Sequence, residues 1–158
     1  MPWDRISLPL ESEGGTYKRV EYGFELFDHT ADLGFRVRAL SLAGLIKPAS
    51  EALYAAIGTL VAGRDAGQRR IEIRDDDAAY LLRDYLTELL VAFEREALIA
   101  TTVGVVSFED GCLVADVAFA TIDQDQSVLC REVKAVTYHE LAIRELPGGF
   151  EATVIVDI

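Results

Sequence analysis

Hydrophobic residues along the chain repeat first with the period of strands and then with that of helices. Phe24 and Leu26 predict a first strand, and the alternation of apolar and arginine residues over 35–39 predicts a half-buried second strand. Apolar residues at helical spacing follow over 42–60, where Ser41 is a suitable N-cap. Pro48 interrupts this pattern, so we expect the helix either to restart there or to be kinked.

A second helix is predicted after a short strand. Residues 63–68 combine glycine with charged residues and predict a solvated loop, whereas Ile71 and Ile73 alternate with charged residues as a strand. The acidic run 75–77 then supplies an N-cap and first-turn acids for a helix over 78–93. We therefore interpret these three acids as a cap rather than as a metal site.

Beyond residue 100 the hydrophobic period changes to two. Strands are predicted over 103–108 and 113–119, joined by a tight turn at Asp110-Gly111. A polar loop at 123–127 precedes a long strand predicted over 132–143, and a Pro-Gly-Gly turn at 147–149 leads into the last strand. Early helices followed by a run of strands predict an α+β domain, with a mixed, largely antiparallel sheet covered by two helices.

The length and composition predict one domain. The chain has 158 residues, of which 51% are hydrophobic, and this is enough for a single core over residues 21–158. Residues 1–20 show no sustained period and predict a loose N-terminal extension.

The net charge of -12 argues against a broad surface for nucleic-acid phosphates, so we expect no DNA partner and contact with RNA only through another protein. No apolar run reaches the roughly 18 residues of a spanning helix, and the first 20 residues carry acids instead of a basic and apolar leader. We expect a cytoplasmic protein with no membrane association. Cys112 and Cys130 lack the spacing of a disulfide framework or a thiolate site, and reduced, inert thiols are expected.

Acidic oxygen donors occur near both ends of the chain. Asp157 directly precedes the α-carboxylate of Ile158, and Asp28 and Asp32 lie between the two predicted N-terminal strands. If the sheet brings these ends together, Asp32, Asp157 and the Ile158 carboxylate could converge on one divalent cation, because hard cations take oxygen ligands. An acid-rich surface without a cation is the alternative interpretation.

The remaining candidates are two histidines and a lysine. His29 could be a ligand or a base, or could hydrogen-bond its own turn. His139 shares strand parity with Val133 and Ala135, which predicts a satisfied core histidine. Lys134, on the opposite parity, could contact a phosphate or a partner carboxylate, or could keep an exposed strand soluble. No Gly-x-Ser-x-Gly motif surrounds any serine, so a hydrolytic triad is unsupported.

Three sequence blocks resemble the archease family: DHTADLGF at 28–35, EVKAVTYHEL at 132–141 and VIVDI at 154–158, with the leucine-rich helix segment 81–90 between them. The resemblance covers residues 22–158. It implies a two-layer α+β fold and a divalent-metal site, with calcium expected and magnesium or manganese as alternatives. The implied ligands are Asp32, Asp157 and the carboxylate of Ile158.

The same resemblance implies an accessory protein with no catalytic residues of its own. An archease activates an RtcB-type RNA ligase in tRNA splicing and RNA repair, promoting guanylylation and turnover and broadening nucleotide use beyond GTP. His29 and Lys134 are then candidates for contact with the ligase or its nucleotide. A stand-alone metal-dependent phosphoesterase and a chaperone-like binding module are the competing interpretations.

Overall fold

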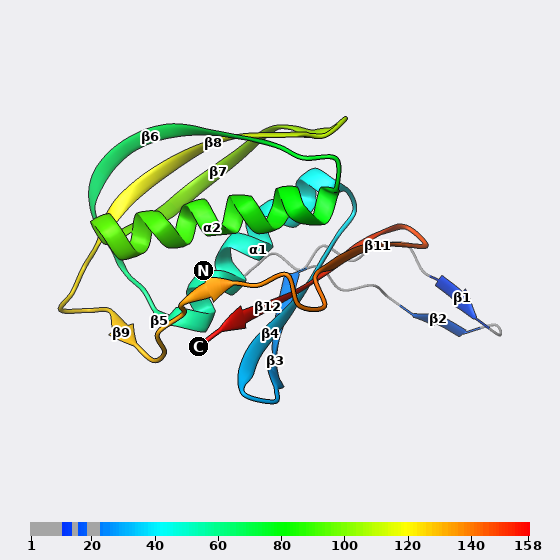
Figure 1. Ribbon diagram of the computed structural model, residues 1–158, viewed down its shortest axis with the longest axis horizontal. Helices are drawn as coiled ribbons and strands as arrows, with labels where there is room; N and C mark the ends of the chain where they lie inside the picture. Colours follow the sequence, from blue (N-terminus) through cyan, green and yellow to red (C-terminus); the bar gives the residue numbers. More distant parts are fainter. Residues whose placement is uncertain (1–10, 14–15, 19–22) are drawn as a thin grey trace.

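The computed structural model describes residues 11–13, 16–18 and 23–158 (Figure 1). β1 (Glu11–Glu13) and β2 (Thr16–Lys18) form a short antiparallel pair with each other. The rest of the extension predicted for residues 1–20 lies outside the described residues.

A five-stranded sheet carries both blocks that contain the predicted ligands. It consists of β3 (Gly23–His29), β4 (Asp32–Ala39), β10 (Ala135–Val136), β11 (Ala142–Leu146) and β12 (Gly149–Asp157). The order is β10-β12-β4-β3, with β11 also paired to β12, and each of these pairings is antiparallel. Leu33, Phe35 and Val37 of β4 are buried, so these alternate side chains face the helices. The predicted alternation is confirmed.

A three-stranded antiparallel sheet consists of β6 (Ala62–Arg74), β7 (Leu98–Glu109) and β8 (Cys112–Ile122), in the order β6-β8-β7. The prediction of a loop at 63–68 is wrong, because this exposed segment is the first half of β6 and pairs with β8 through two register shifts. Hydrophobic periodicity reports burial rather than backbone pairing, so it misses an edge strand whose side chains are solvated. The Asp110-Gly111 turn is confirmed, and both residues have positive φ, as its tight geometry requires.

Two helices complete the domain, α1 (Leu42–Ile57) and α2 (Ala78–Glu96). The predicted caps are confirmed: Ser41 Oγ accepts a hydrogen bond from Gly44 N at 3.0 Å, and Asp77 Oδ1 accepts one from Ala79 N at 2.8 Å. α1 does not restart at Pro48, which lies buried inside one continuous helix.

The core lies where the helices meet the sheets. Both helices contact strands of the two sheets, and Figure 1 shows α1 and α2 between the three-stranded sheet above and the five-stranded sheet below. Tyr85 of α2 is fully buried and shares a 2.9 Å hydrogen bond with Ser50 of α1, and burial raises the pKa of its hydroxyl to about 12. The predicted α+β class, with antiparallel strands and two helices, is confirmed.

The long strand predicted over 132–143 is wrong, because the chain leaves the sheet after β10 and returns only at β11. Thr137 lies at the break, where its hydroxyl donates to Ile155 O at 2.9 Å and accepts from His139 N at 3.2 Å. A threonine that bonds the backbone nearby offers the chain a turn in place of the strand ladder. In the described part of the chain, no helix is long and apolar enough to span a membrane.

Candidate functional site

The two predicted carboxylate ligands lie side by side at one end of the five-stranded sheet. The pairing of β12 with β4 places Val156 opposite Leu33, and Asp157 and Asp32 follow immediately in this register. Directly opposed residues on neighbouring strands have Cβ atoms roughly 4.5–5.5 Å apart. Antiparallel pairing therefore brings together two acids that are 125 residues apart in the sequence.

Asp32 and Asp157 also point to the same side of the sheet. Leu33 and Val156 are buried against the helices, and successive side chains alternate between the faces of a strand. The two aspartates therefore face away from the helices, and both are half-buried. His29 is paired with Asp32 across the β3–β4 hairpin, so its side chain lies on the same face, next to the two aspartates. We call the side chains of His29, Asp32 and Asp157 the row.

A two-residue turn sets this hairpin register. Thr30 and Ala31 connect β3 to β4, and Thr30 has a φ of 45°. Positive φ is unusual for a β-branched residue, so the turn that aligns His29 with Asp32 is a strained one.

Next to the row, the aromatic ring of Phe27 packs over Gly34. Phe27 is paired with Gly34 on the same face as His29 and Asp32, and its ring lies so close that a Cβ at Gly34 would collide with it. Arg36 also stacks on this ring, with its guanidinium carbon 4.3 Å from the ring centroid. The glycine of the DHTADLGF block is therefore explained by packing next to the site.

Ile158 and Lys134 border the row. The side chain of Ile158 packs against the hydrophobic core, and its carboxylate follows Asp157 directly in the chain. The main-chain N–H of Lys134 donates to Asp157 O at 2.8 Å, while its side chain is exposed. The structure thus ties the backbone of Lys134 to the predicted site, and the contact proposed for its ammonium remains a prediction.

The prediction that His139 is a core histidine is wrong, because its side chain is 63% exposed. The chain turns after Thr137, so strand parity no longer applies. This turn carries His139 to His29, with ring centroids 5.2 Å apart, and brings Glu140 Oε2 to 3.2 Å from His29 Nε2. The meeting of His139 and Glu140 with His29 was missed by the sequence analysis, and the turn-forming Thr137 is the signal that could have indicated it.

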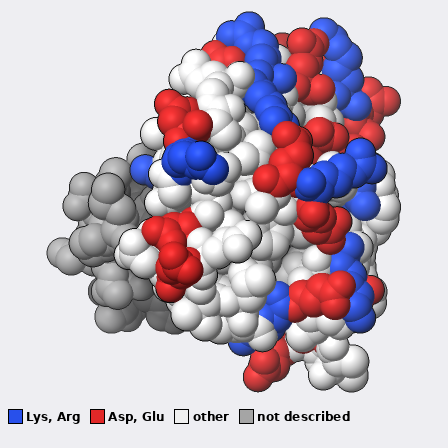
Figure 2. All heavy atoms as spheres, turned by 90° about the vertical axis from the view of Figure 1, so that its left-hand side faces the viewer, with Lys and Arg blue, Asp and Glu red and all other residues white. Residues whose placement is uncertain are grey.

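In the part of the chain that the structure describes, the acids of the row lack the cationic partners found elsewhere on the surface. Among the described residues, neither Asp32 nor Asp157 forms an ion pair, whereas Asp116 on β8 accepts two hydrogen bonds from Arg70. On the face drawn in Figure 2, basic and acidic side chains are likewise interspersed. Adjacent carboxylates without a counter-charge repel each other and offer the oxygen ligands that hard cations prefer.

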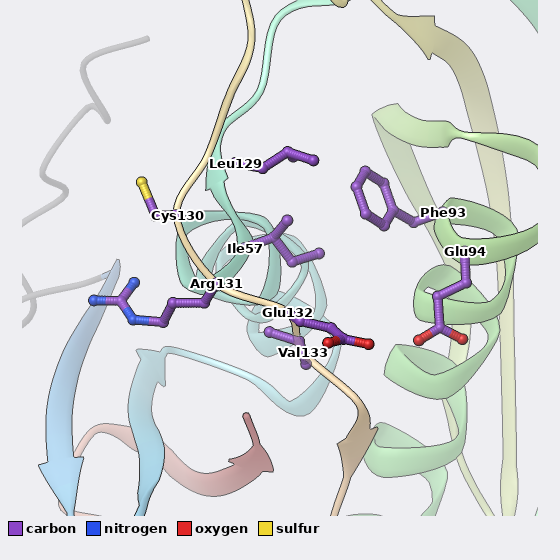
Figure 3. Close-up of a pocket in the computed structure, with 8 residues that line it drawn as sticks. All are labelled: Ile57, Phe93, Glu94, Leu129, Cys130, Arg131, Glu132 and Val133. Carbon is purple, nitrogen blue, oxygen red and sulfur yellow. The ribbon is translucent and has the colours of Figure 1, made fainter.

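A separate pocket of about 380 Å³ lies where the end of α2 meets the chain after β9 (Val128–Leu129). Figure 3 shows Ile57, Phe93 and Leu129 grouped together, with the carboxylates of Glu94 and Glu132 nearby, while Cys130 and Arg131 point away. β9 pairs with β5 (Gly58–Thr59), and this pairing positions the pocket wall. This pocket was not predicted from the sequence, where its signal is the apolar pair Val128-Leu129 in a polar segment, a pair that is exposed in the structure.

The sequence of this chain is similar to that of known proteins over most of its length. The model of the Archease protein family matches residues 24–158. The protein archease of Methanothermobacter thermautotrophicus is 32% identical over 138 residues, which are 86% of this chain and 99% of the relative. That of Methanopyrus kandleri is 33% identical over 138 residues, which are 85% of this chain and 99% of the relative.

Two solved structures share the fold. The solution structure of Methanobacterium thermoautotrophicum protein 1598 superposes with a TM-score of 0.68 at 31% identity, covering 86% of this chain and 99% of its own. The crystal structure of a Thermotoga maritima archease, titled a possible chaperone, superposes with a TM-score of 0.62 at 18% identity, covering 85% and 96%. At 18% identity, the similarity to the Thermotoga maritima structure shows only that the fold is shared.

Proposed function

This chain belongs to the archease family, and from that premise we propose that it is a non-catalytic activator of an RtcB-type RNA ligase in tRNA splicing and RNA repair. The proposed activity is faster guanylylation of the ligase and faster turnover, with broader use of nucleotides. The observation that carries the proposal is the side-by-side placement of Asp32 and Asp157 at the sheet end, on a face turned away from the core.

The proposed site binds one divalent cation, with calcium expected, through Asp32, Asp157 and the α-carboxylate of Ile158. The donor set fits this ion, because calcium takes carboxylate oxygens in flexible geometry. A further property of the row favours cation binding: among the described residues, neither of its two acids forms an ion pair within the protein. When bound, the cation would neutralise the row and present a fixed positive centre to the ligase or its nucleotide.

This chain's own residues would act by binding and positioning. An acidic protein approaches a basic surface of a partner faster than a neutral one does, so the net charge of -12 favours encounter with a basic ligase face. His29, in the row, and the exposed Lys134, at its border, would contact the ligase or its nucleotide. The protein would either carry a divalent ion to the ligase or stabilise the ligase conformation that reacts with GTP.

The test is a time course of covalent guanylylation. The purified cognate ligase is incubated with GTP and manganese, with and without this protein, and the labelled ligase is followed. We expect a faster rate and repeated turnover when the protein is present. An unchanged rate would refute the proposed function.

The same preparation distinguishes the competing functions. The phosphoesterase interpretation predicts hydrolysis of generic phosphoesters by this protein alone, and the chaperone-like interpretation predicts no cation binding in calorimetry. The activator proposal predicts the opposite result in both experiments. A single carboxylate-bound calcium is a weak generator of hydroxide, which argues against the phosphoesterase.

A further inference from the structure

A second group of potential ligands lies beside the proposed calcium site and has a different chemistry. His29, His139 and Glu140 bring one donor atom each to within 4.8 Å of one another. Of the His, Cys, Asp and Glu side chains in the described part of the chain, these three form such a group, and neither Asp32 nor Asp157 belongs to it. The cluster joins the end of β3 to the turn after β10, two segments that are 110 residues apart.

The spacing of the donor atoms is close to that of a bound ion. Glu140 presents one oxygen to each ring: Oε2 lies 3.2 Å from His29 Nε2, and Oε1 lies 3.9 Å from His139 Nε2. In a tetrahedral zinc site with ligand distances of about 2.0–2.1 Å, neighbouring donor atoms are roughly 3.3 Å apart. Small side-chain rotations would close this cluster around one ion, and two of its three members are exposed and free to make them.

The donor types select a different metal from that of the neighbouring row. Imidazole nitrogens suit zinc and other first-row transition ions, whereas calcium and magnesium prefer oxygen ligands. Two imidazoles with one carboxylate form a three-ligand set of the kind that leaves a coordination position open.

An ordinary ion pair between His29 and Glu140 does not explain the cluster fully. His29 Nδ1 is buried and has no hydrogen-bond partner among the described residues, so a charged imidazolium, which donates from both nitrogens, would bury an unsatisfied donor on a charged ring, whereas a metal-bound imidazole stays neutral. The backbone of Glu140 also has a φ of 51°, a conformation that side chains other than glycine rarely adopt. The chain thus holds a glutamate in a strained position between two imidazoles.

We propose that His29, His139 and Glu140 form a transition-metal site, separate from the calcium site at Asp32 and Asp157, that binds a zinc-like divalent ion. The site does not depend on the proposed action on an RNA ligase.

The experiment measures Zn²⁺ binding by calorimetry and Co²⁺ binding by visible absorption, on untagged full-length protein with excess calcium present. The parent protein carries Cys130→Ser, because the exposed Cys130 thiol could bind zinc by itself. Two variants remove one ligand each: His139→Gln, and Glu140→Gln, which preserves the side-chain length and the strained backbone position. Both side chains are exposed, so neither variant should unfold the protein, and far-UV circular dichroism checks this.

We expect one zinc ion per chain and a cobalt spectrum without a thiolate charge-transfer band. Each variant should weaken zinc binding at least about tenfold. The matched control Glu145→Gln removes an exposed carboxylate from β11 and should leave the affinity unchanged. Asp157→Asn should abolish calcium binding and leave zinc binding in place.

Equal zinc affinity in the parent and both ligand variants would overturn the proposal, as would the absence of zinc binding in the parent. Loss of zinc binding in Asp157→Asn to the same degree as in His139→Gln would also overturn it, because the two sites would then be one. If the protein binds zinc but does not stimulate the ligase, only the proposed function is refuted, and the zinc site stands.

Discussion

Acidic side chains are held in opposite ways in two regions of the molecule, the surface of the three-stranded sheet and the end of the five-stranded sheet. On the three-stranded sheet, Arg70 pairs with Asp116 at 2.7 Å and Arg74 with Glu72 at 2.7 Å. At the end of the five-stranded sheet, Asp32 and Asp157 lie next to each other, and among the described residues no cation pairs with either. Asp116 and Glu72 are thus neutralised from within the described part of the protein, whereas Asp32 and Asp157 are not.

The contrast is sharper within β12 itself. Glu151 and Asp157 share a strand and a parity, yet Glu151 is only 4% exposed and binds two arginines, Arg38 at 2.7 Å and Arg144 at 2.8 Å. Burial alone would raise the pKa of Glu151, but the hydrogen bonds from Arg38 and Arg144 outweigh it and hold the pKa below its usual value. A carboxylate with built-in counter-charges contributes to the fold, whereas a pair without them is available to a cation from outside.

The largest expected effect is on the unpaired acids. Asp32→Asn or Asp157→Asn should remove calcium binding in calorimetry, because each replaces an anionic ligand with a neutral amide. Asp116→Asn, the matched change on the other sheet, should leave calcium binding intact. Retained calcium affinity in both ligand variants, with the fold intact by circular dichroism, would place the cation elsewhere.

Glu151→Gln should destabilise the fold by about 1–3 kcal/mol in urea unfolding, because it leaves charge-assisted bonds to two arginines unmade. Glu72→Gln, which breaks an exposed pair, should produce no measurable change. Because the folded pKa of Glu151 is lowered, its contribution is present above the ordinary value of 4.5 and is lost as the pH falls through the folded pKa. The wild type should therefore lose more stability on acidification than Glu151→Gln does, and equal acid losses would contradict this assignment.

Lys134→Ala should reduce stimulation of ligase guanylylation without changing calcium affinity. The ammonium is exposed and available to a partner, whereas the main-chain bond to Asp157 O survives the substitution. A parallel loss of calcium binding would mean that the side chain supports the metal site instead.

A last effect concerns α1. Burial raises the pKa of Glu51 to about 7, partly offset by the charge of Lys47. Because the folded pKa lies above the ordinary value of 4.5, this group makes the fold less stable as the pH rises from 4.5 to about 7. The melting temperature of Glu51→Gln should therefore change less with pH over this interval than that of the wild type. Glu88→Gln, an exposed change on α2, should behave like the wild type. Identical profiles for Glu51→Gln and the wild type would contradict the shifted pKa.

The sequence predicted the fold where burial follows a regular period. The alternation over 35–39, the caps at Ser41 and Asp77, and the Asp110-Gly111 turn all follow from local rules and are confirmed. The first half of β6 was missed because an exposed strand has no hydrophobic signal.

For the site, sequence position identified the acids, and antiparallel pairing of β4 with β12 brought Asp32 and Asp157 together. The cluster around His29 was missed, because strand parity was extended past Thr137, where the chain leaves the sheet and His139 turns away from the core. The alternation of side chains between the two faces of a strand no longer predicts burial where a side chain bonds the nearby backbone in place of the hydrogen bonds between strands.

The central claim is that the row at the end of the five-stranded sheet binds a cation and thereby activates an RNA ligase. The most direct test is the initial rate of ligase guanylylation with saturating wild-type protein, Asp157→Asn, Asp116→Asn and a variant with one glycine appended after Ile158. The appended residue turns the α-carboxylate into an amide and moves the charge roughly 3.5 Å along the chain. We expect stimulation by the wild type and Asp116→Asn, and its loss in Asp157→Asn and the extended variant. Full stimulation by folded Asp157→Asn would contradict the account.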